Sequence, residues 1–251
     1  MYCVIPVSDL PEFYPGDPLP EMLAERLAIG EPGLEPGDII VVTQKIVSKS
    51  EGRLIDPAVV VPSAQAAALA AEVIKDPGLV ELVLRESREV VRKAPHVLIT
   101  RHRLGHVMAN GGIDASNIGP GRNGMVLLLP ENPDASAAAI ASACHRRTGV
   151  RPGVVISDSF GRPWRMGTVN VAIGSCGVSA VVDQRGEPDR DGRTMQVTQI
   201  ALADAAAAAA GLAMGEGREG LPVCVLRGLA WEPSDQTSAA IFRSEAEDLF
   251  R

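Results

Sequence analysis

The chain has 251 residues, of which 46% are hydrophobic, and its formal net charge is −7. This length and composition suffice to bury a sizeable core in one large domain or two interleaved smaller ones, and they exclude a disordered chain. Lysine and arginine never form runs longer than two residues, so the chain lacks the broad basic face that binds duplex nucleic acid.

The sequence also lacks the features of secreted and membrane proteins. Its first residues, MYCVIPVSDL, carry no positively charged leader, and no apolar run is long enough to span a bilayer. The four cysteines, Cys3, Cys144, Cys176 and Cys224, lie far apart without a CxxC pair, which favours reduced core thiols over a disulfide or zinc site. We therefore expect a cytoplasmic protein with no membrane or nucleic-acid partner.

Three elements are predicted near the N-terminus. Residues 1–7 have strand character, the apolar spacing from Leu19 to Ile29 predicts a helix, and the continuous apolar run 39–42 suits a strand covered on both faces. Lys45 and Lys49 follow this strand, four residues apart. They fit one solvated helix face as well as they fit a functional strand end.

The next segment is predicted to be helical and then extended. Residues 63–92 have helical spacing with one Pro-Gly break, and residues 96–100 form a candidate strand. His102 and His106 have the spacing of metal-binding histidines on a helix, but Gly105 lies between them and no acid accompanies them. A histidine metal site is therefore the weaker interpretation.

A glycine-rich bend over residues 110–117 carries the acid Asp114. Its two glycines allow the backbone to approach a ligand closely, and Asp114 with Asn117 can supply one metal ligand and one amide. An Asx-turn explains the same residues, so both interpretations stay open. A short strand is predicted at residues 126–129.

The stretch around Asp158 combines an acid, a hydroxyl and two arginines. Residues 154–156 predict a buried strand that ends just before Asp158, and a Gly/Arg loop over 161–167 leads to a second strand over 169–173. A carboxylate at a strand end beside such a loop suits a metal and phosphate site. A turn capped by Asp158 accounts for the same pattern.

Two longer helices are predicted in the second half of the chain. One runs over residues 133–148 with Asp134 as its N-cap, and an alanine-rich one runs over residues 195–214. A charged loop over 186–193 precedes the second helix, and Glu216 lies in a glycine-rich loop after it. The negative end of the helix dipole there favours a cation over a bare phosphate.

The last predicted elements are a strand over residues 222–226 and a terminal helix over residues 244–250. No internal repeat and no separable linker occurs along the sequence. We therefore expect a single domain over residues 1–251, built in one piece or as two interleaved subdomains.

Three acids thus stand in glycine-containing loops or at a predicted strand end: Asp114, Asp158 and Glu216. Ser159 adds a hydroxyl beside one of them. Hard oxygen ligands of this kind suit Mg²⁺ or Mn²⁺ when water and phosphate complete the coordination. A shared site requires that these distant segments converge.

Seven separated blocks point to a known family. In chain order they are GDIIVVTQKIVSKSEGRL, NGGIDASN, LLPENPDASA, ISDSFGRPWRMG, NVAIGSCGV, DRDGR and MGEGREGLPVCVLRG. Their order and spacing closely resemble the coenzyme F420-0:γ-glutamyl ligase family from Val4 to about Asp248. Some relatives carry an additional nitroreductase-like C-terminal domain, and this chain resembles the stand-alone form.

The resemblance implies a fold, a reaction and cofactors. The fold is a mixed α+β structure, with mixed sheets and packed helices, that forms an intertwined homodimer. The reaction is a GTP-dependent ligation of L-glutamate to the lactyl carboxylate of F420-0, then of a further γ-linked glutamate, giving F420-1 and F420-2. An acyl phosphate is the implied intermediate, GDP and phosphate are the products of GTP, and two divalent ions (Mg²⁺ or Mn²⁺) with K⁺ are the implied ions.

The resemblance also implies roles for the matching residues. Asp114 and Asp158 correspond to ligands of one divalent metal, and Ser159 and Glu216 correspond to ligands of a second. The implied guanine-nucleotide contacts are Leu10, Pro11, Glu12, Phe13, Gln44, Lys45, Lys49, Asn117, Met214, Gly215, Glu216, Gly217, Arg218, Glu219, Gly220 and Leu221. Gln44 and Lys45 depart from the serine and threonine of archaeal members, whereas Lys49 matches.

Charge and position suggest a catalytic set of Asp114, Asp158, Lys49, Arg162 and Arg165. In this set the three cations stabilise the phosphates of the nucleotide or the phosphodiester and carboxylate of the acceptor. Two other functions use the same residues. One is another metal-dependent kinase or ATP-grasp-like ligase, and the other is a silent nucleotide- or flavin-binding module in which the acids cap turns.

Overall fold

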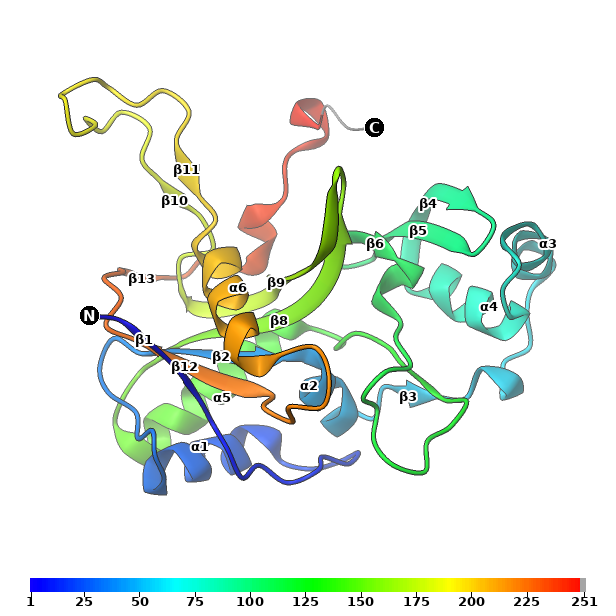
Figure 1. The fold of residues 1–251 in the computed structure, drawn as a ribbon, viewed down its shortest axis with the longest axis horizontal. Helices are drawn as coiled ribbons and strands as arrows, with labels where there is room; N and C mark the ends of the chain where they lie inside the picture. Colours follow the sequence, from blue (N-terminus) through cyan, green and yellow to red (C-terminus); the bar gives the residue numbers. More distant parts are fainter. Residues whose placement is uncertain (249–251) are drawn as a thin grey trace.

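The computed structural model describes residues 1–248, which form six α-helices and four β-sheets (Figure 1). The largest sheet has six strands in the order β1-β12-β2-β8-β9-β13. Its strands are β1 (Cys3–Pro6), β12 (Val223–Arg227), β2 (Ile39–Thr43), β8 (Gly153–Arg162), β9 (Arg165–Val178) and β13 (Pro233–Ser234). In this sheet β2 and β8 pair in parallel and the other neighbours are antiparallel. The predicted mixed α+β class is confirmed.

Helices cover both faces of this sheet. Helices α1 (Leu19–Ile29) and α5 (Pro133–Thr148) lie on one face, and α6 (Leu202–Met214) lies on the other. Side chains of β2 alternate between the two cores, because Ile40 and Val42 join the α1/α5 core whereas Ile39 and Val41 join the α6 core. The strand is therefore covered on both faces, as its apolar run predicts.

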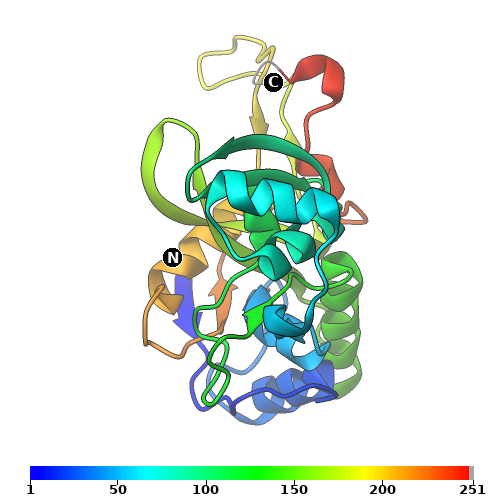
Figure 2. The ribbon, with the colours of Figure 1, turned by 90° about the vertical axis from the view of Figure 1, so that its right-hand side faces the viewer.

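A second, smaller core lies beside the main sheet. Its strands are β4 (Ser87–Ala94), β5 (Val97–His102) and β6 (Val107–Ala109), and its helices are α3 (Ala64–Val73) and α4 (Pro77–Arg85). Figure 2 shows this part facing the viewer, with both helices in cyan. Strands β3 (Leu54–Ile55) and β7 (Val126–Leu127) pair where the chain enters and leaves it. The helix α2 (Gln44–Ser50) connects β2 to β3.

The helix predicted to run through residue 92 is wrong beyond Arg85. Strand β4 follows instead and pairs antiparallel with β5. The β-branched pair Val90 and Val91 among charged residues favours a strand with one face in solvent. Half-buried Val90 packs against the smaller core, while Val91 is exposed.

The alanine-rich helix begins at Leu202 and not at Met195. The residues before it form an arm in which β11 (Gln199–Ile200) pairs with β10 (Val182–Asp183), and the predicted charged loop connects these two strands. Of the predicted terminal helix, residues 245–247 form a single 3₁₀ turn, and residues 249–250 lie outside the described residues.

Asp134 does not cap α5. The N-cap is Asn132, whose side chain accepts from the Ala135 N–H at 3.1 Å. Asp134 instead accepts from the backbone N–H groups of Ser175 at 2.7 Å and Ser238 at 3.0 Å. This carboxylate therefore fastens α5 to β9 and to the C-terminal segment.

Strand β8 does not end at Asp158. It continues to Arg162 and pairs with β9 as a long hairpin, with register shifts between Ile156 and Ser157 and between Gly161 and Arg162. Ser157 is still fully buried, and from Asp158 onward the residues leave the buried core but keep their place in the ladder. The hairpin tip and the β10–β11 arm both project from the body of the molecule (Figures 1 and 2).

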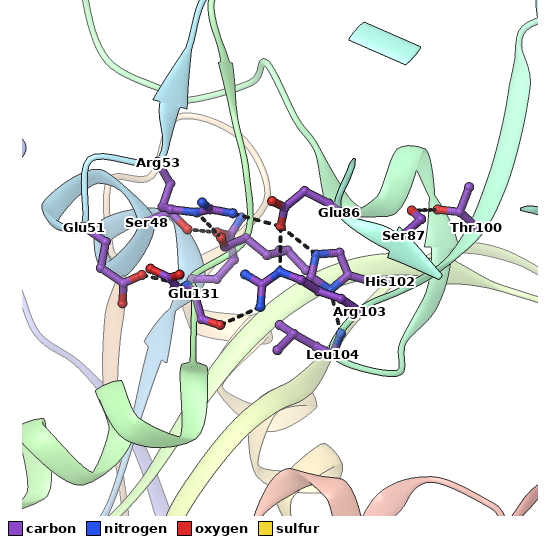
Figure 3. Close-up of polar contacts among 12 residues, drawn as sticks. Ser48, Glu51, Arg53, Glu86, Ser87, Thr100, His102, Arg103, Leu104 and Glu131 are labelled. Carbon is purple, nitrogen blue, oxygen red and sulfur yellow. Dashed lines mark hydrogen bonds and ion pairs between the residues drawn. The ribbon is translucent and has the colours of Figure 1, made fainter. Parts of the chain in front are cut away.

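A buried polar cluster joins the two cores (Figure 3). Glu86 Oε2 lies 2.8 Å from Arg53 Nη2, 3.1 Å from Arg103 Nε and 3.3 Å from His102 Nε2. Arg53 and Arg103 also donate to the backbone carbonyls of Leu129 and Glu131. Burial opposes ionisation of Glu86, but these partners prevail and lower its pKa to about 2. The cluster thereby ties the chain before β3 to β5 and to the start of α5.

The structure bears on the predictions about membrane helices and about the cysteines. No helix in the described part of the chain has the length and apolar character needed to cross a bilayer. The cysteines are free thiols, of which Cys144 and Cys224 are buried as expected. Cys3 is exposed, so its assignment to the core is wrong, because it lies on the edge strand β1.

We expect Gly174→Ala to lower the free energy of unfolding by about 2 kcal/mol, within the range for overpacked cores. A Cβ at Gly174 would lie 2.5 Å from Pro133 C and Cβ, where α5 starts against β9. Urea denaturation measures the change. Gly161→Ala in the same hairpin is the control, because nothing lies within 4 Å of its Cβ position; equal stability of the two variants would contradict the prediction.

Candidate active site

A pocket of about 900 Å³ brings together segments that are far apart in the sequence. It is lined by the chain after β1, the start of α2, the glycine-rich segment 114–126, the middle of the β8–β9 hairpin and the loop after α6. The parallel pairing of β2 with β8 places Thr43 beside Ser157. The residues that come next in the two segments, among them Lys45 and Asp158, therefore line the same pocket.

Most of the predicted site residues line this pocket. They are Leu10, Pro11, Glu12, Phe13, Lys45, Lys49, Asp114, Asn117, Asp158, Ser159, Met214, Gly215, Glu216, Gly217, Arg218, Gly220 and Leu221. Gln44 and Glu219 do not line it. Gln44 is fully buried behind the wall and its Oε1 accepts from Ser48 Oγ at 2.8 Å, while Glu219 accepts from the Gly217 N–H at 2.8 Å and shapes the loop.

Lys45 and Asp114 form the first charged pair of the pocket. Lys45 Nζ donates to the Asp114 carboxylate, to the Ser116 carbonyl at 2.7 Å and to Ser116 Oγ at 2.9 Å. Asp114 also accepts from the Ser116 N–H at 2.9 Å, so the predicted Asx-turn and the pocket position coexist. Burial opposes ionisation, but the hydrogen bonds from Lys45 and Ser116 outweigh it, and the pKa of Asp114 lies below its ordinary value.

The pKa of Asp158 is shifted in the opposite direction to that of Asp114. Burial raises its pKa to about 7, although the Ser159 N–H and the charge of Lys45 act against this shift. Within residues 1–248, Asp158 forms no ion pair closer than 4 Å. A partly buried carboxylate without a cation partner is a fitting ligand for a divalent cation.

Glu216 and Ser159 form a second polar group. Ser159 Oγ donates to Glu216 Oε2 at 2.7 Å, and Asn170 Nδ2 donates to Glu216 Oε1 at 2.8 Å. Asn170 was not among the predicted residues. The one signal for it in the sequence is a polar side chain between Val169 and Val171 in an apolar strand.

Asp114, Asp158 and Glu216 share one pocket but do not form a single cluster. No group of three or more His, Cys, Asp or Glu side chains in the described residues could hold a metal ion. Asp114 with Asp158, and Ser159 with Glu216, each offer two oxygen donors to the same pocket. Mg²⁺ is commonly bound by one or two carboxylates together with substrate phosphates, so this donor set fits divalent ions brought in with a nucleotide.

Two further cations line the pocket, and both lie near Glu12. Lys49 is only 6% exposed and its Nζ lies 2.6 Å from Glu12 Oε1, so the solvated-face interpretation is wrong for this residue. Arg122 lies 3.8 Å from the same carboxylate oxygen and 5.2 Å above the ring of Tyr14. Sequence reasoning missed Arg122, although it stands in a glycine-rich segment, GPGRNG.

Arg162 and Arg165 lie away from the pocket of their own chain. Both are exposed at the tip of the β8–β9 hairpin, and Arg162 Nη1 donates to the Gly167 carbonyl at 3.1 Å. They do not line the pocket that holds Asp158.

The two histidines with metal-like spacing lie in other environments. His102 accepts from the Leu104 N–H through Nδ1 at 3.0 Å, which leaves the Nε2 proton to face Glu86. The ring of His106 packs 4.8 Å from that of Phe242 and 6.2 Å from that of Phe160. Burial lowers the pKa of His106 to about 4, so the ring is neutral at physiological pH.

Comparisons with known proteins agree with the blocks that line the pocket. Residues 8–228 match the family model described as F420-0:Gamma-glutamyl ligase. A protein of Methanopyrus kandleri named coenzyme F420:L-glutamate ligase is 43% identical over 94% of this chain and 92% of its own length. Proteins of the same name from Methanocaldococcus jannaschii and Methanothermobacter thermautotrophicus are each 40% identical, over 97% and 99% of this chain and 94% and 98% of their own lengths. The chain therefore belongs to the F420-0:γ-glutamyl ligase family.

Proposed function

We propose that this protein is a coenzyme F420-0:L-glutamate ligase that uses GTP to join L-glutamate to F420-0 in coenzyme F420 biosynthesis. The observation that carries the proposal is one pocket that collects the oxygen donors Asp114, Asp158, Ser159 and Glu216 together with cations, among them the buried Lys49. The relatives at about 40% identity carry the name of this activity. We place the reaction in the cytoplasm, where GTP and free glutamate are available.

The chemistry of amide formation accounts for such a pocket. A carboxylate is a poor acyl donor to an amine, so the proposed route transfers the γ-phosphate of GTP to the lactyl carboxylate of F420-0. The glutamate amine then displaces phosphate from this acyl phosphate, leaving GDP, phosphate and the amide. No covalent bond to the enzyme is needed, and the same steps extend F420-1 to F420-2 through the γ-carboxylate.

The oxygen donors of the pocket suggest which residues would hold each divalent ion. Asp114 and Asp158 would hold one divalent ion, Mg²⁺ or Mn²⁺, and Ser159 with Glu216 would hold the second. When bound, such ions neutralise the phosphate charge that develops during transfer. K⁺ is proposed as a further activator of the ligation reaction.

The cations of the chain bind and orient the nucleotide in this proposal. Lys45 holds the Asp114 carboxylate in place through its contacts with Asp114 and Ser116. Lys49 and Arg122 both lie near Glu12, and the phosphates of GTP would compete with Glu12 for them. The glycines of loop 214–221 line the same pocket and let the backbone approach the nucleotide closely.

Product analysis tests this function. Purified protein with F420-0, L-glutamate, GTP, Mn²⁺ or Mg²⁺ and K⁺ should yield species one and two glutamate residues heavier in the mass spectrum, with GDP as the nucleotide product. ATP in place of GTP separates this enzyme from an ATP-grasp-like ligase. GTP turnover without a glutamylated product would contradict the proposal, and binding of nucleotide without turnover would favour a silent binding module.

We also propose that two copies of the chain form an intertwined homodimer through the projecting arms. Trp164 and Met166 at the hairpin tip are 81% and 98% exposed, and Val197 on the other arm is 83% exposed. Exposed apolar side chains on projecting strands favour burial against another chain. In such a dimer Arg162 and Arg165 can serve the pocket of the partner, since they do not line their own.

Mixing two inactive variants tests this arrangement. We expect Asp158→Asn and the double variant Arg162→Ala/Arg165→Ala each to be inactive, and their refolded mixture to recover about a quarter of the wild-type activity, because half of the dimers then hold one intact shared site. Sedimentation gives the oligomeric state. A monomer, or a mixture as inactive as its components, would contradict the proposed shared site.

A further inference from the structure

Glu216 is held by a cross-strand pair of side chains. Ser159 on β8 lies opposite Asn170 on β9 in the register of the hairpin. Directly opposed residues of an antiparallel pair place their side chains on the same face. Here they hold the two oxygens of one carboxylate, Ser159 on Oε2 at 2.7 Å and Asn170 on Oε1 at 2.8 Å.

The Glu216 side chain depends on this pair for its orientation. It follows the C-terminus of α6 by two residues, after Gly215 at φ 70°, in a loop with little packing of its own. In the described part of the chain, the hydrogen bonds of its carboxylate are those from Ser159 and Asn170. An ionised carboxylate only accepts hydrogen bonds, so the amide of Asn170 must present its NH₂ group.

A glycine in α6 makes room for the amide. Gly211 is the single glycine in the helix sequence LADAAAAAAGLAM. A Cβ at this position would lie 2.5 Å from Asn170 Nδ2 and 2.9 Å from Asn170 Cγ. Glycine destabilises a helix interior relative to alanine, so a glycine among alanines needs a reason. At Gly211 the reason is space, because the methyl group of an alanine there would displace Asn170.

We propose that Asn170 is a positioning residue that orients Glu216 for the second divalent ion, and that Gly211 preserves its position. This inference rests on the proposed function, because it assigns Glu216 and Ser159 to that ion. Ser159 would itself be a ligand of this ion, whereas Asn170 would contact only the Glu216 carboxylate and not the ion. Asn170 would thus fix the carboxylate from outside the coordination sphere, a task that outer partners of metal ligands commonly perform.

Manganese binding without turnover tests the role of Asn170. The free Mn²⁺ signal in electron paramagnetic resonance is followed as Mn²⁺ is added to protein and GTP, with F420-0 and glutamate left out. We expect Asn170→Ala to weaken one of the two Mn²⁺ sites by about 10- to 100-fold and to leave the other unchanged. Thr168→Ala is the matched control, because Thr168 is exposed on the same strand and does not line the pocket.

Gly211→Ala supplies a second, independent variant. It should weaken the same Mn²⁺ site although alanine favours the helix, so a loss of Mn²⁺ affinity at unchanged or raised melting temperature separates positioning from general destabilisation. In the double variant Asn170→Ala/Gly211→Ala the added methyl group has no amide to displace. The double variant should therefore bind Mn²⁺ no more weakly than Asn170→Ala alone.

The outcomes distinguish this inference from the proposed function. If the wild-type protein binds Mn²⁺·GTP and Asn170→Ala binds it equally well at both sites, the positioning role is wrong while the ligase function stands. If the effects of Asn170→Ala and Gly211→Ala add in the double variant, the role of Gly211 is wrong. If the wild-type protein binds no Mn²⁺·GTP, the proposed function itself fails.

Discussion

Asp158→Asn is expected to lower kcat/KM for glutamate ligation by at least about 10³-fold, because in the proposed function it removes a metal ligand and its charge from the phosphoryl-transfer site. Asparagine has the shape of aspartate, so the hairpin register is retained. The same variant should also lose Mn²⁺-dependent GTP binding in a calorimetric titration. Initial rates with F420-0, glutamate and GTP give the first quantity.

The stability of this variant should change in the opposite direction. Burial raises the pKa of Asp158 from 3.8 to about 7, so the folded chain binds a proton that the unfolded chain releases, and stability falls as pH rises between these values. Asparagine removes this cost, and the metal-free variant should melt at a higher temperature than the wild type at pH 8.

Asp235→Asn serves as the control for both measurements, because Asp235 is exposed and does not line the pocket. An Asp158→Asn variant that still bound GTP with Mn²⁺ would show that Asp158 is a structural residue. That result would return the pocket acids to the role of turn caps.

Glu86→Ala is expected to destabilise the protein by about 3 kcal/mol at pH 7, the lower end of the range for breaking a buried ion pair, because its arginine partners are partly exposed. The change leaves the partly buried Arg53 and Arg103 close together and without their shared carboxylate. For a chain of this size we expect the melting temperature to fall by roughly 10 °C. Urea denaturation at pH 7 gives the free energy of unfolding.

The pH dependence provides an internal check. Because the pKa of Glu86 is lowered from 4.5 to about 2, its contribution is fully present above pH 4.5 and is lost as pH falls toward 2. The difference in stability between wild type and Glu86→Ala should therefore shrink across that window.

Glu72→Gln is the matched control. Its carboxylate pairs with Lys93 at 2.7 Å, but 54% of the Glu72 side chain and 47% of the Lys93 side chain are exposed. Such a pair contributes at most about 1 kcal/mol. If Glu86→Ala cost no more than Glu72→Gln, the cluster in Figure 3 would not join the two cores as described.

Local patterns predict much of this fold because single segments carry the information. The helix Leu19–Ile29 has the predicted bounds, and the apolar run of β2 is covered on both faces. The errors occur where a neighbour far along the chain decides. Strand β4 replaces a predicted helix because β5 pairs with it, and Asp134 leaves its capping position because Ser175 and Ser238 donate to it.

The same distinction between local patterns and distant contacts applies to the residues of the candidate site. Asp114, Asp158 and Glu216 were identified from loop composition and family blocks, and they line one pocket. Asn170 and Arg122 could not be found in this way, since their meaning lies in contacts with Glu216 and Glu12. The Glu86 cluster likewise needs segments that only the folded chain brings together.

The continuation of β8 through Asp158 and Ser159 has a mechanical consequence. Two candidate ligands lie in the middle of the same antiparallel ribbon whose free end carries Trp164 and Met166. The two strands share a ladder of backbone hydrogen bonds, so a tilt imposed at the tip is passed to Asp158 and Ser159 together and, through Ser159 and Asn170, to Glu216. A contact at the tip therefore shifts these groups relative to Asp114, which lies on another segment of the pocket.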